Sequence, residues 1–171
     1  MKPVVAIVVR PNVGKSTLLN RLTRSRAALV ADIPGLTRDR QYGDGRVGDR
    51  SYLVVDTGGV VEALAMRPSG SCETPALRDQ VMTQTRQALT EADAVIFLVD
   101  ARAGVQPIDR ELAADLRRLG KFLVLAVNKA EGLDPAMAAA EFHVLGLGGP
   151  YCISASHGDG VENLMQQALS E

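Results

Sequence analysis

The chain alternates short, uniformly apolar runs with segments whose apolar residues recur every three or four positions. The runs are rich in Val, Ile, Leu and Phe, and they lack the period-two polarity of half-exposed strands. They span residues 4–9, 52–55, 94–99 and 122–127, and a fifth candidate spans 151–154. Strands that are apolar on both faces belong inside a parallel sheet covered by helices, so the pattern predicts the α/β class.

Helical spacing of apolar residues follows three of these runs, at 18–22, 108–119 and 161–169. Pro107 and Pro135 stand where helices favour a first residue, and the spacing of Asp159 and Glu162 predicts a capping box that opens the last helix.

One hairpin is also expected, because Gly48 and Asp49 form a turn signal between residues 41–47 and 50–56. The predicted sheet therefore has six strands, is mostly parallel and carries one antiparallel edge hairpin. Two stretches, 27–40 and 58–75, show no periodicity, and long loops in a compact domain are usually functional.

Composition excludes several classes of protein. With 171 residues, 46% hydrophobic and 23% charged, the chain is expected to form one globular domain. A net charge of −1 provides no global attraction to nucleic acid or to an acidic membrane. Cys72 and Cys152 form no metal or redox motif, and no apolar run approaches the length of a membrane span. We therefore expect a cytoplasmic protein with no membrane partner.

A phosphate-binding loop is predicted where the first apolar run meets the first helix. Successive backbone N–H groups and a helix N-terminus attract polyphosphate, Lys15 would contact the β- and γ-phosphates, and the Ser16 hydroxyl would ligate Mg²⁺. The Gly-Lys-Ser triplet alone is a weak signal, and an ordinary turn with a solvated lysine is the alternative. The loop and its flanks comprise Val9, Arg10, Pro11, Asn12, Val13, Gly14, Lys15, Ser16 and Thr17.

Three further groups of residues follow other predicted strands, at the edge where open α/β sheets bind ligands. The first could hold a metal-bound water and contact a terminal phosphate, the second could frame a purine with a carboxylate, and the third could offer a backbone N–H to guanine O6. Each alone could be only a loop, but their order favours a guanine-nucleotide site. They are Asp56, Thr57, Gly58 and Gly59; Asn128, Lys129, Ala130 and Glu131; and Ser154, Ala155 and Ser156.

Together with residues 34–39, these motifs resemble the translation-factor class of P-loop GTPases and, within it, the Era-like group. They are most similar to the first GTPase domain of the Der (EngA) family. The resemblance implies a three-layer P-loop NTPase G domain that hydrolyses GTP to GDP and phosphate as a switch in assembly of the large ribosomal subunit. It also implies that Thr37 ligates Mg²⁺, with Ser16 and Asp56, and that 27–40 and 58–75 are the switch loops.

Longer proteins of that family carry a second GTPase domain and a KH-like RNA-binding domain. The resemblance therefore implies that residues 1–171 are a single G domain, a fragment of a longer tandem GTPase. Its expected partners are GTP and GDP, the other domains of the same chain, and the large subunit or its RNA through the full-length protein.

Catalysis is expected to depend on Lys15, Thr37 and Asn12. Val60 follows Gly59 where many GTPases place a water-orienting Gln, and its side chain has no hydrogen-bonding group. The resemblance implies that a K⁺ ion held partly by Asn12 supplies positive charge instead. The alternative source of that charge is Arg38 or Arg40.

Two residues depart from the family pattern. Val9 stands in place of the first loop glycine, and a β-branched residue in an unusual conformation would cost about 1 to 3 kcal/mol. Glu131 stands in place of the usual Asp and adds a methylene. Both changes predict weaker binding, so a degenerate docking module is a competing hypothesis. An ATP-dependent enzyme is a second one, against which Asn128 and Ala155 argue.

Overall fold

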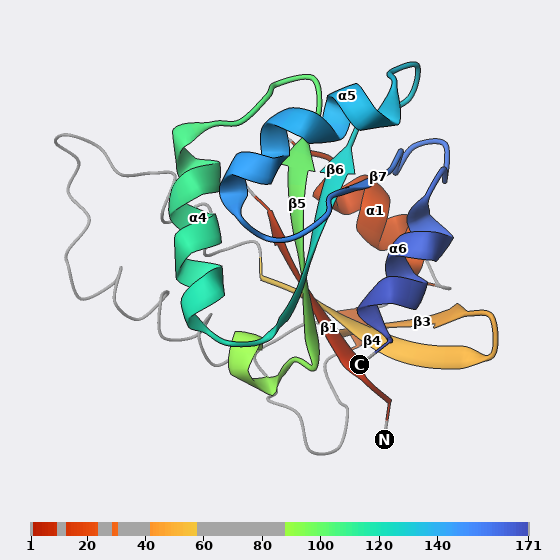
Figure 1. Ribbon diagram of the computed structural model, residues 1–171. Coiled ribbons are helices and arrows are strands. Elements are labelled where there is room, and N and C mark those ends of the chain that lie inside the picture. The colour runs from red at the N-terminus through yellow and green to blue at the C-terminus, as the bar shows by residue number, and fades with distance from the viewer. Residues whose placement is uncertain (1, 10–12, 24–28, 31–41, 58–87, 171) are drawn as a thin grey trace, which may run out of the picture.

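The computed structural model describes residues 2–9, 13–23, 29–30, 42–57 and 88–170, and within them a single twisted sheet (Figure 1). The sheet has seven strands in the order β2-β3-β4-β1-β5-β6-β7. The pairs β4–β1, β1–β5, β5–β6 and β6–β7 are parallel, and the pairs β2–β3 and β3–β4 are antiparallel. The strands are β1 (Val4–Val9), β2 (Leu29–Val30), β3 (Tyr42–Val47), β4 (Arg50–Asp56), β5 (Ala94–Asp100), β6 (Phe122–Asn128) and β7 (Tyr151–Cys152).

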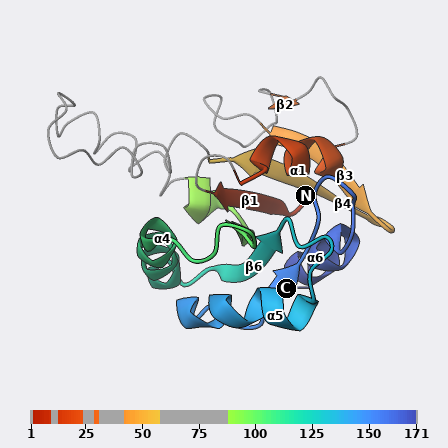
Figure 2. The same ribbon diagram turned by 90° about the horizontal axis from the view of Figure 1, so that it is seen from above.

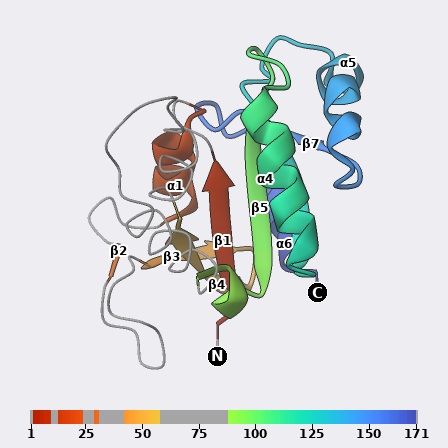
Figure 3. The same ribbon diagram turned by 90° about the vertical axis from the view of Figure 1, so that its left-hand side faces the viewer.

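Helices cover both faces of the sheet and make the three layers that the sequence predicts (Figure 2). Helices α1 and α6 pack against one face, and α4 and the 3-10 helix η1 pack against the other (Figure 3). No helix of the described residues has the length and apolar character needed to cross a membrane. The helices are α1 (Lys15–Leu22), α4 (Pro107–Arg118), α5 (Pro135–Ala140), η1 (Glu141–Leu145) and α6 (Val161–Ala168).

Strand β1 explains why the apolar runs show no alternation. All six of its residues are buried. Val5 and Ile7 pack into the core beside α1 and α6, whereas Ala6 and Val8 pack into the core beside α4. Since both faces of the strand exclude water, no position favours a polar residue.

The predicted fold class is confirmed, and so are the starts of α4 at Pro107 and α5 at Pro135. The six predicted strands are present, and the two-residue β2 adds a seventh at the antiparallel edge. The predicted capping box of the last helix is wrong. Helix α6 begins after Gly160, whose φ of 73° is left-handed, and a Cβ there would lie 2.5 Å from the Cys152 carbonyl oxygen.

Val9 has a regular strand conformation without strain in this structure, and the predicted effect on nucleotide binding stays a prediction. Val9 is the last residue of β1, pairs with Leu98 of β5 and is 3% exposed. The one non-glycine residue with positive φ in the described part of the chain is Lys129. Valine therefore suits this position, because it extends a regular strand and fills the core beside α1.

We predict that Val9→Gly lowers the free energy of unfolding by about 2 to 4 kcal/mol, since it removes a buried side chain and loosens a central strand. Urea denaturation measures this loss. The free energy of unfolding of Val9→Ala should lie between those of the parent and of Val9→Gly. A glycine variant that is as stable as the parent and binds nucleotide more tightly would restore the strain hypothesis.

Candidate functional site

The carboxyl ends of β1, β4, β5 and β6 lie along one edge of the sheet (Figure 1). The parallel register sets Asp56 at the end of β4 beside Ile7 of β1, and Asp100 beside Asn128 at the ends of β5 and β6. Thr57, directly after β4, is buried at the same edge, and its hydroxyl donates a hydrogen bond to the Ile7 carbonyl of β1 over 2.6 Å. The predicted motifs that the structure describes therefore meet at one edge, as expected for ligand binding in an open α/β sheet.

The phosphate-binding loop turns into α1 at Gly14. This residue has a φ of 99°, and its carbonyl accepts the first helical bond from Leu18 over 3.0 Å. The first N–H groups of an α-helix have no partner within the helix, and the helix dipole adds positive charge at that end. The side chains of Ser16 and Thr17 are exposed there. The start of α1 is thus suited to an anion.

Asn128 joins this loop to the loop that follows β7. Its side chain is 3% exposed, donates from Nδ2 to the Val13 carbonyl over 2.7 Å and accepts at Oδ1 from the Ala155 N–H over 2.9 Å. These partners lie 115 and 27 residues away in the chain. A Cβ at Gly14 would lie 2.5 Å from Nδ2, so the close approach of Asn128 requires glycine in the loop.

Lys129 follows in a left-handed conformation, with a φ of 62°. Such a conformation costs a non-glycine residue about 1 to 2 kcal/mol and persists where surrounding contacts enforce it. One such contact is the ion pair of its Nζ with Asp100 Oδ2, at 3.0 Å.

Asp100 is itself held by the turn that follows β5. Its Oδ1 accepts from the N–H groups of Arg102 and Ala103 over 2.8 and 3.3 Å. Burial raises the pKa of the Asp100 carboxyl, but the Lys129 side chain and the two N–H groups outweigh burial and hold that pKa below its usual range. Asp100 is not among the residues predicted from the sequence, although a carboxylate directly after the apolar run 94–99 was a usable signal.

Glu131 lies in the loop after β6, three residues beyond Asn128. Its backbone carbonyl accepts from Arg102 Nη2 over 2.6 Å, which ties the loop after β6 to the loop after β5. Its Oε2 is buried and has no hydrogen-bond partner among the described residues. The backbone N–H of Glu131 and the Ser154 hydroxyl lower the pKa of its carboxyl, although burial acts in the opposite direction. The carboxylate therefore has capacity for N–H donors of a ligand.

The loop after β7 is ordered by its own hydrogen bonds. Ser154 is 1% exposed, and its backbone N–H donates to the Asp159 carbonyl over 2.9 Å. Its hydroxyl accepts from the His157 N–H over 3.2 Å and lies 3.3 Å from the Ser156 hydroxyl. Ala130 on the neighbouring loop donates to the Ile153 carbonyl over 3.1 Å, so the two loops share backbone contacts.

Seven predicted site residues lie outside the described residues: Arg10, Pro11, Asn12, Thr37, Gly58, Gly59 and Val60. Their roles stay predictions. Of the three predicted Mg²⁺ ligands, two lie in the described part of the chain: Ser16 at the start of α1 and Asp56 at the end of β4.

Comparison with known proteins identifies the family. A family model described as "50S ribosome-binding GTPase" matches residues 4–129. The chain belongs to this GTPase family. The membership confirms the GTPase resemblance seen in the motifs.

Relatives of this GTPase agree with that assignment. The chain is 61% identical over 171 residues to GTPase Der of Bordetella petrii, covering 99% of the chain and 36% of the relative. Similar matches to GTPase Der of other species also cover 36% of those proteins, so the chain spans about a third of their length.

Two solved structures are similar over 99% of the chain, each with a TM-score of 0.73. One is an Aquifex aeolicus Era variant bound to GDP and AlF4⁻, which is 30% identical and matched over 57% of its length. The other is Era in complex with MgGDPNP and a segment of 16S ribosomal RNA, which is 28% identical and matched over 57% of its length.

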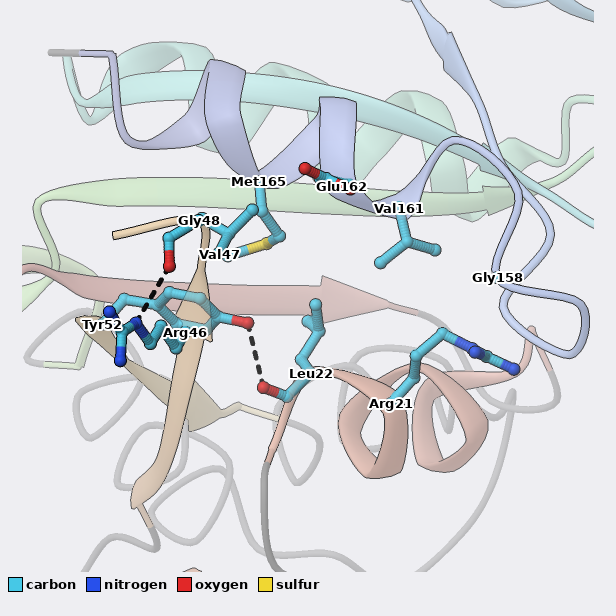
Figure 4. Close-up of a pocket in the computed structure, with 10 residues that line it drawn as sticks. All are labelled: Arg21, Leu22, Arg46, Val47, Gly48, Tyr52, Gly158, Val161, Glu162 and Met165. Atoms are coloured by element: carbon cyan, nitrogen blue, oxygen red, sulfur yellow. Dashed lines mark hydrogen bonds between the residues drawn. The ribbon is translucent and has the colours of Figure 1, made fainter. Parts of the chain in front are cut away.

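A separate cavity of about 310 Å³ lies between α1, the β3–β4 hairpin and α6 (Figure 4). Its walls include Leu22, Tyr52 and Met165, and none of the predicted site residues lines it. This cavity is therefore not the GTPase site that the motifs predict.

We predict that Asp100→Asn destabilises the GTPase fold by about 1 to 3 kcal/mol at neutral pH, because it removes the charge that holds Lys129. Since the folded-state pKa of Asp100 is depressed, its stabilising effect is complete above the ordinary value of 3.8 and is lost as the pH falls through the lower folded-state value. Denaturant unfolding of both proteins between pH 2 and 8 measures the difference.

Asp115→Asn is the matched control, since Asp115 pairs with Arg118 at 3.3 Å on the exposed face of α4. This substitution should change the free energy of unfolding by no more than about 1 kcal/mol. An Asp100→Asn penalty no larger than that of the control, or one that grows on acidification, would contradict the proposed support of Lys129.

Proposed function

We propose that this chain binds GTP and GDP at the carboxyl edge of its sheet and hydrolyses GTP to GDP and phosphate. The observation that carries the proposal is Asn128, which connects the phosphate-binding loop at Val13 to the base-binding loop at Ala155. The family description and the Der relatives support the same activity. The family description also names binding to the 50S ribosomal subunit. We further propose a role in assembly of that subunit for a longer cytoplasmic tandem GTPase, of which this chain is the first G domain.

The phosphates would bind at the start of α1, with Lys15 near the β- and γ-phosphates. Oxygen donors of the kind that Mg²⁺ prefers are expected from Ser16, Thr37 and Asp56. The ion fits this place, because Ser16 is exposed in the first turn of α1 and carries a hydroxyl oxygen. When bound, Mg²⁺ neutralises charge that develops on the phosphates. The related Era structure with MgGDPNP supports the assignment.

The base would lie between the loops after β6 and β7. Guanine carries N–H donors at N1 and N2 and an acceptor at O6. Glu131 Oε2, which has no hydrogen-bond partner among the described residues, suits the donors. The Ser156 N–H suits the acceptor, because the N–H groups of Ser154 and Ala155 already donate to Asp159 and Asn128. Adenine presents the opposite pattern at its 6-position. The site therefore favours GDP over ADP.

The docking-module alternative is not favoured, because the family description and the Der relatives support a GTPase. Contact with the large subunit or its RNA and with other domains of a longer chain remains part of our proposal. The Era complex with 16S ribosomal RNA supports an RNA partner of some kind.

Isothermal titration of the chain with GDP, GTP and ADP in the presence of Mg²⁺ tests the proposed activity, together with phosphate release from GTP. We expect binding of both guanine nucleotides, much weaker binding of ADP, and slow turnover of GTP. Binding of none of the three would favour the docking module, and equal binding of GDP and ADP would favour an ATP-dependent enzyme.

We predict that Glu131→Asp tightens GDP binding by roughly 5- to 150-fold, because a shorter side chain improves pairing with the guanine donors by about 1 to 3 kcal/mol. Titration of GDP into both proteins measures the change. Glu162→Asp on the exposed surface of α6 controls for side-chain shortening and should have no effect. A change below about twofold at residue 131 would exclude the base contact.

GTP hydrolysis should be faster in K⁺ than in Na⁺ at equal ionic strength. Val60 has no polar group to orient water, and Asn12 stands in the phosphate-binding loop where it could hold a monovalent cation. Asn12→Ala should abolish the difference while the far-ultraviolet circular dichroism stays unchanged. Equal rates in both salts would point instead to Arg38 or Arg40.

A further inference from the structure

Arg21 reaches from the last turn of α1 to the loop after β7. Its Nε donates to the Ala155 carbonyl over 2.7 Å, and its Nη2 donates to the Ser156 carbonyl over 2.8 Å. Figure 4 shows the side chain leaving α1 toward the loop that carries Gly158. The helix that begins at the phosphate-binding loop is therefore fastened, at its other end, to the loop expected to contact the base.

The two bonds fix two consecutive peptide planes. In a trans peptide the carbonyl and the following N–H point in opposite directions. Holding the Ala155 carbonyl therefore sets the direction of the Ser156 N–H, which has no acceptor among the described residues. Holding the Ser156 carbonyl sets the His157 N–H, which donates to Ser154 Oγ over 3.2 Å.

The absence of a side chain at Gly158 leaves room for the Arg21 guanidinium beside this loop. Its φ is 87°, and a Cβ at this position would lie 2.8 Å from Arg21 Nη1. Any larger residue would displace the guanidinium. The loop thus combines two carbonyl acceptors with a gap in which a planar guanidinium fits.

We propose that Arg21 is a positioning residue for guanine recognition, which acts by fixing the peptide planes of the loop at residues 155–157. This inference rests on the proposed function, since it concerns the same site. Arginine suits the task because its planar fork donates two parallel bonds at a fixed spacing, whereas the ammonium of a lysine is a point donor. Arg21 itself does not contact the nucleotide. It fixes the orientation of the backbone groups of the loop that do.

Arg21→Gln and Arg21→Lys test the proposal in the full chain, with titration of GDP and ADP as the measurement. We expect Arg21→Gln to weaken GDP binding about tenfold while ADP binding stays unchanged, because the donor to guanine O6 is lost from position. Arg21→Lys should weaken GDP binding less. A purely structural role would lower the melting temperature without changing the ratio of the two affinities.

Arg46 offers a matched control. It lines the opposite wall of the same cavity, and its Nε donates to the Gly48 carbonyl over 2.9 Å without touching the loop after β7 (Figure 4). Arg46→Gln removes the same charge and a similar hydrogen bond. We expect it to leave the ratio of GDP to ADP affinity unchanged.

Gly158→Ala completes a double-mutant cycle. On the parent chain it should reduce the GDP preference, because the added Cβ displaces the guanidinium. In the Arg21→Gln background its effect should be smaller, since the side chain that it displaces is already gone and only the backbone strain of an alanine at a φ of 87° remains. Additive effects would contradict the proposal.

The outcomes separate the inference from the proposed function. A parent chain that shows no preference for GDP overturns both. A parent chain that prefers GDP, with Arg21→Gln keeping that preference, overturns the role of Arg21 alone. If Arg21→Gln does not fold, Arg21→Lys and Gly158→Ala still test the proposal, and a retained GDP preference in both would overturn it.

Discussion

A buried side-chain amide at the end of β6 holds the candidate site together. Asn128 has almost no contact with water, so both ends of its amide need protein partners. It finds them in the Val13 carbonyl and the Ala155 N–H, which belong to loops at the two ends of the chain. Separating these loops would leave buried polar groups unpaired at about 1 to 3 kcal/mol each. The phosphate-binding and base-binding segments are thereby made into one unit.

Cationic side chains from three elements reinforce this unit. Lys129 pairs with Asp100, Arg102 holds the Glu131 carbonyl, and Arg21 holds two carbonyls beyond β7. The parallel strands support the loops, which are fixed by charge-assisted hydrogen bonds and by the apolar packing of Val13 and Ala155 in the core. Arg102 holds the backbone of Glu131, and one carboxylate oxygen of Glu131 has no hydrogen-bond partner in the described part of the chain. That combination of fixed backbone and unpaired oxygen is suited to ligand recognition.

The sequence predicts the central strands well, because burial on both faces leaves an uninterrupted apolar run; the predicted bounds of 4–9 are those of β1. It does not predict β2, since two residues at an edge carry no periodicity. Val9, predicted both as the end of the strand at residues 4–9 and as a residue of the phosphate-binding loop, extends β1 and fills the core, and its effect on nucleotide binding stays a prediction. At the site, Asn128 and Glu131 were found from their place after a strand, and Asp100 could have been found in the same way. Arg21 gave no signal, because a basic residue in the last turn of a helix is common.

The central claim is that residues 13–17, 128–131 and 154–156 form one nucleotide site through Asn128. Amide hydrogen exchange, measured segment by segment with and without Mg²⁺ and GDP, tests it most directly. The account predicts that nucleotide slows exchange in all three segments together, and that Asn128→Ala abolishes the slowing in all three. Slowing confined to 13–17, or slowing that persists in all segments of the variant, would contradict it.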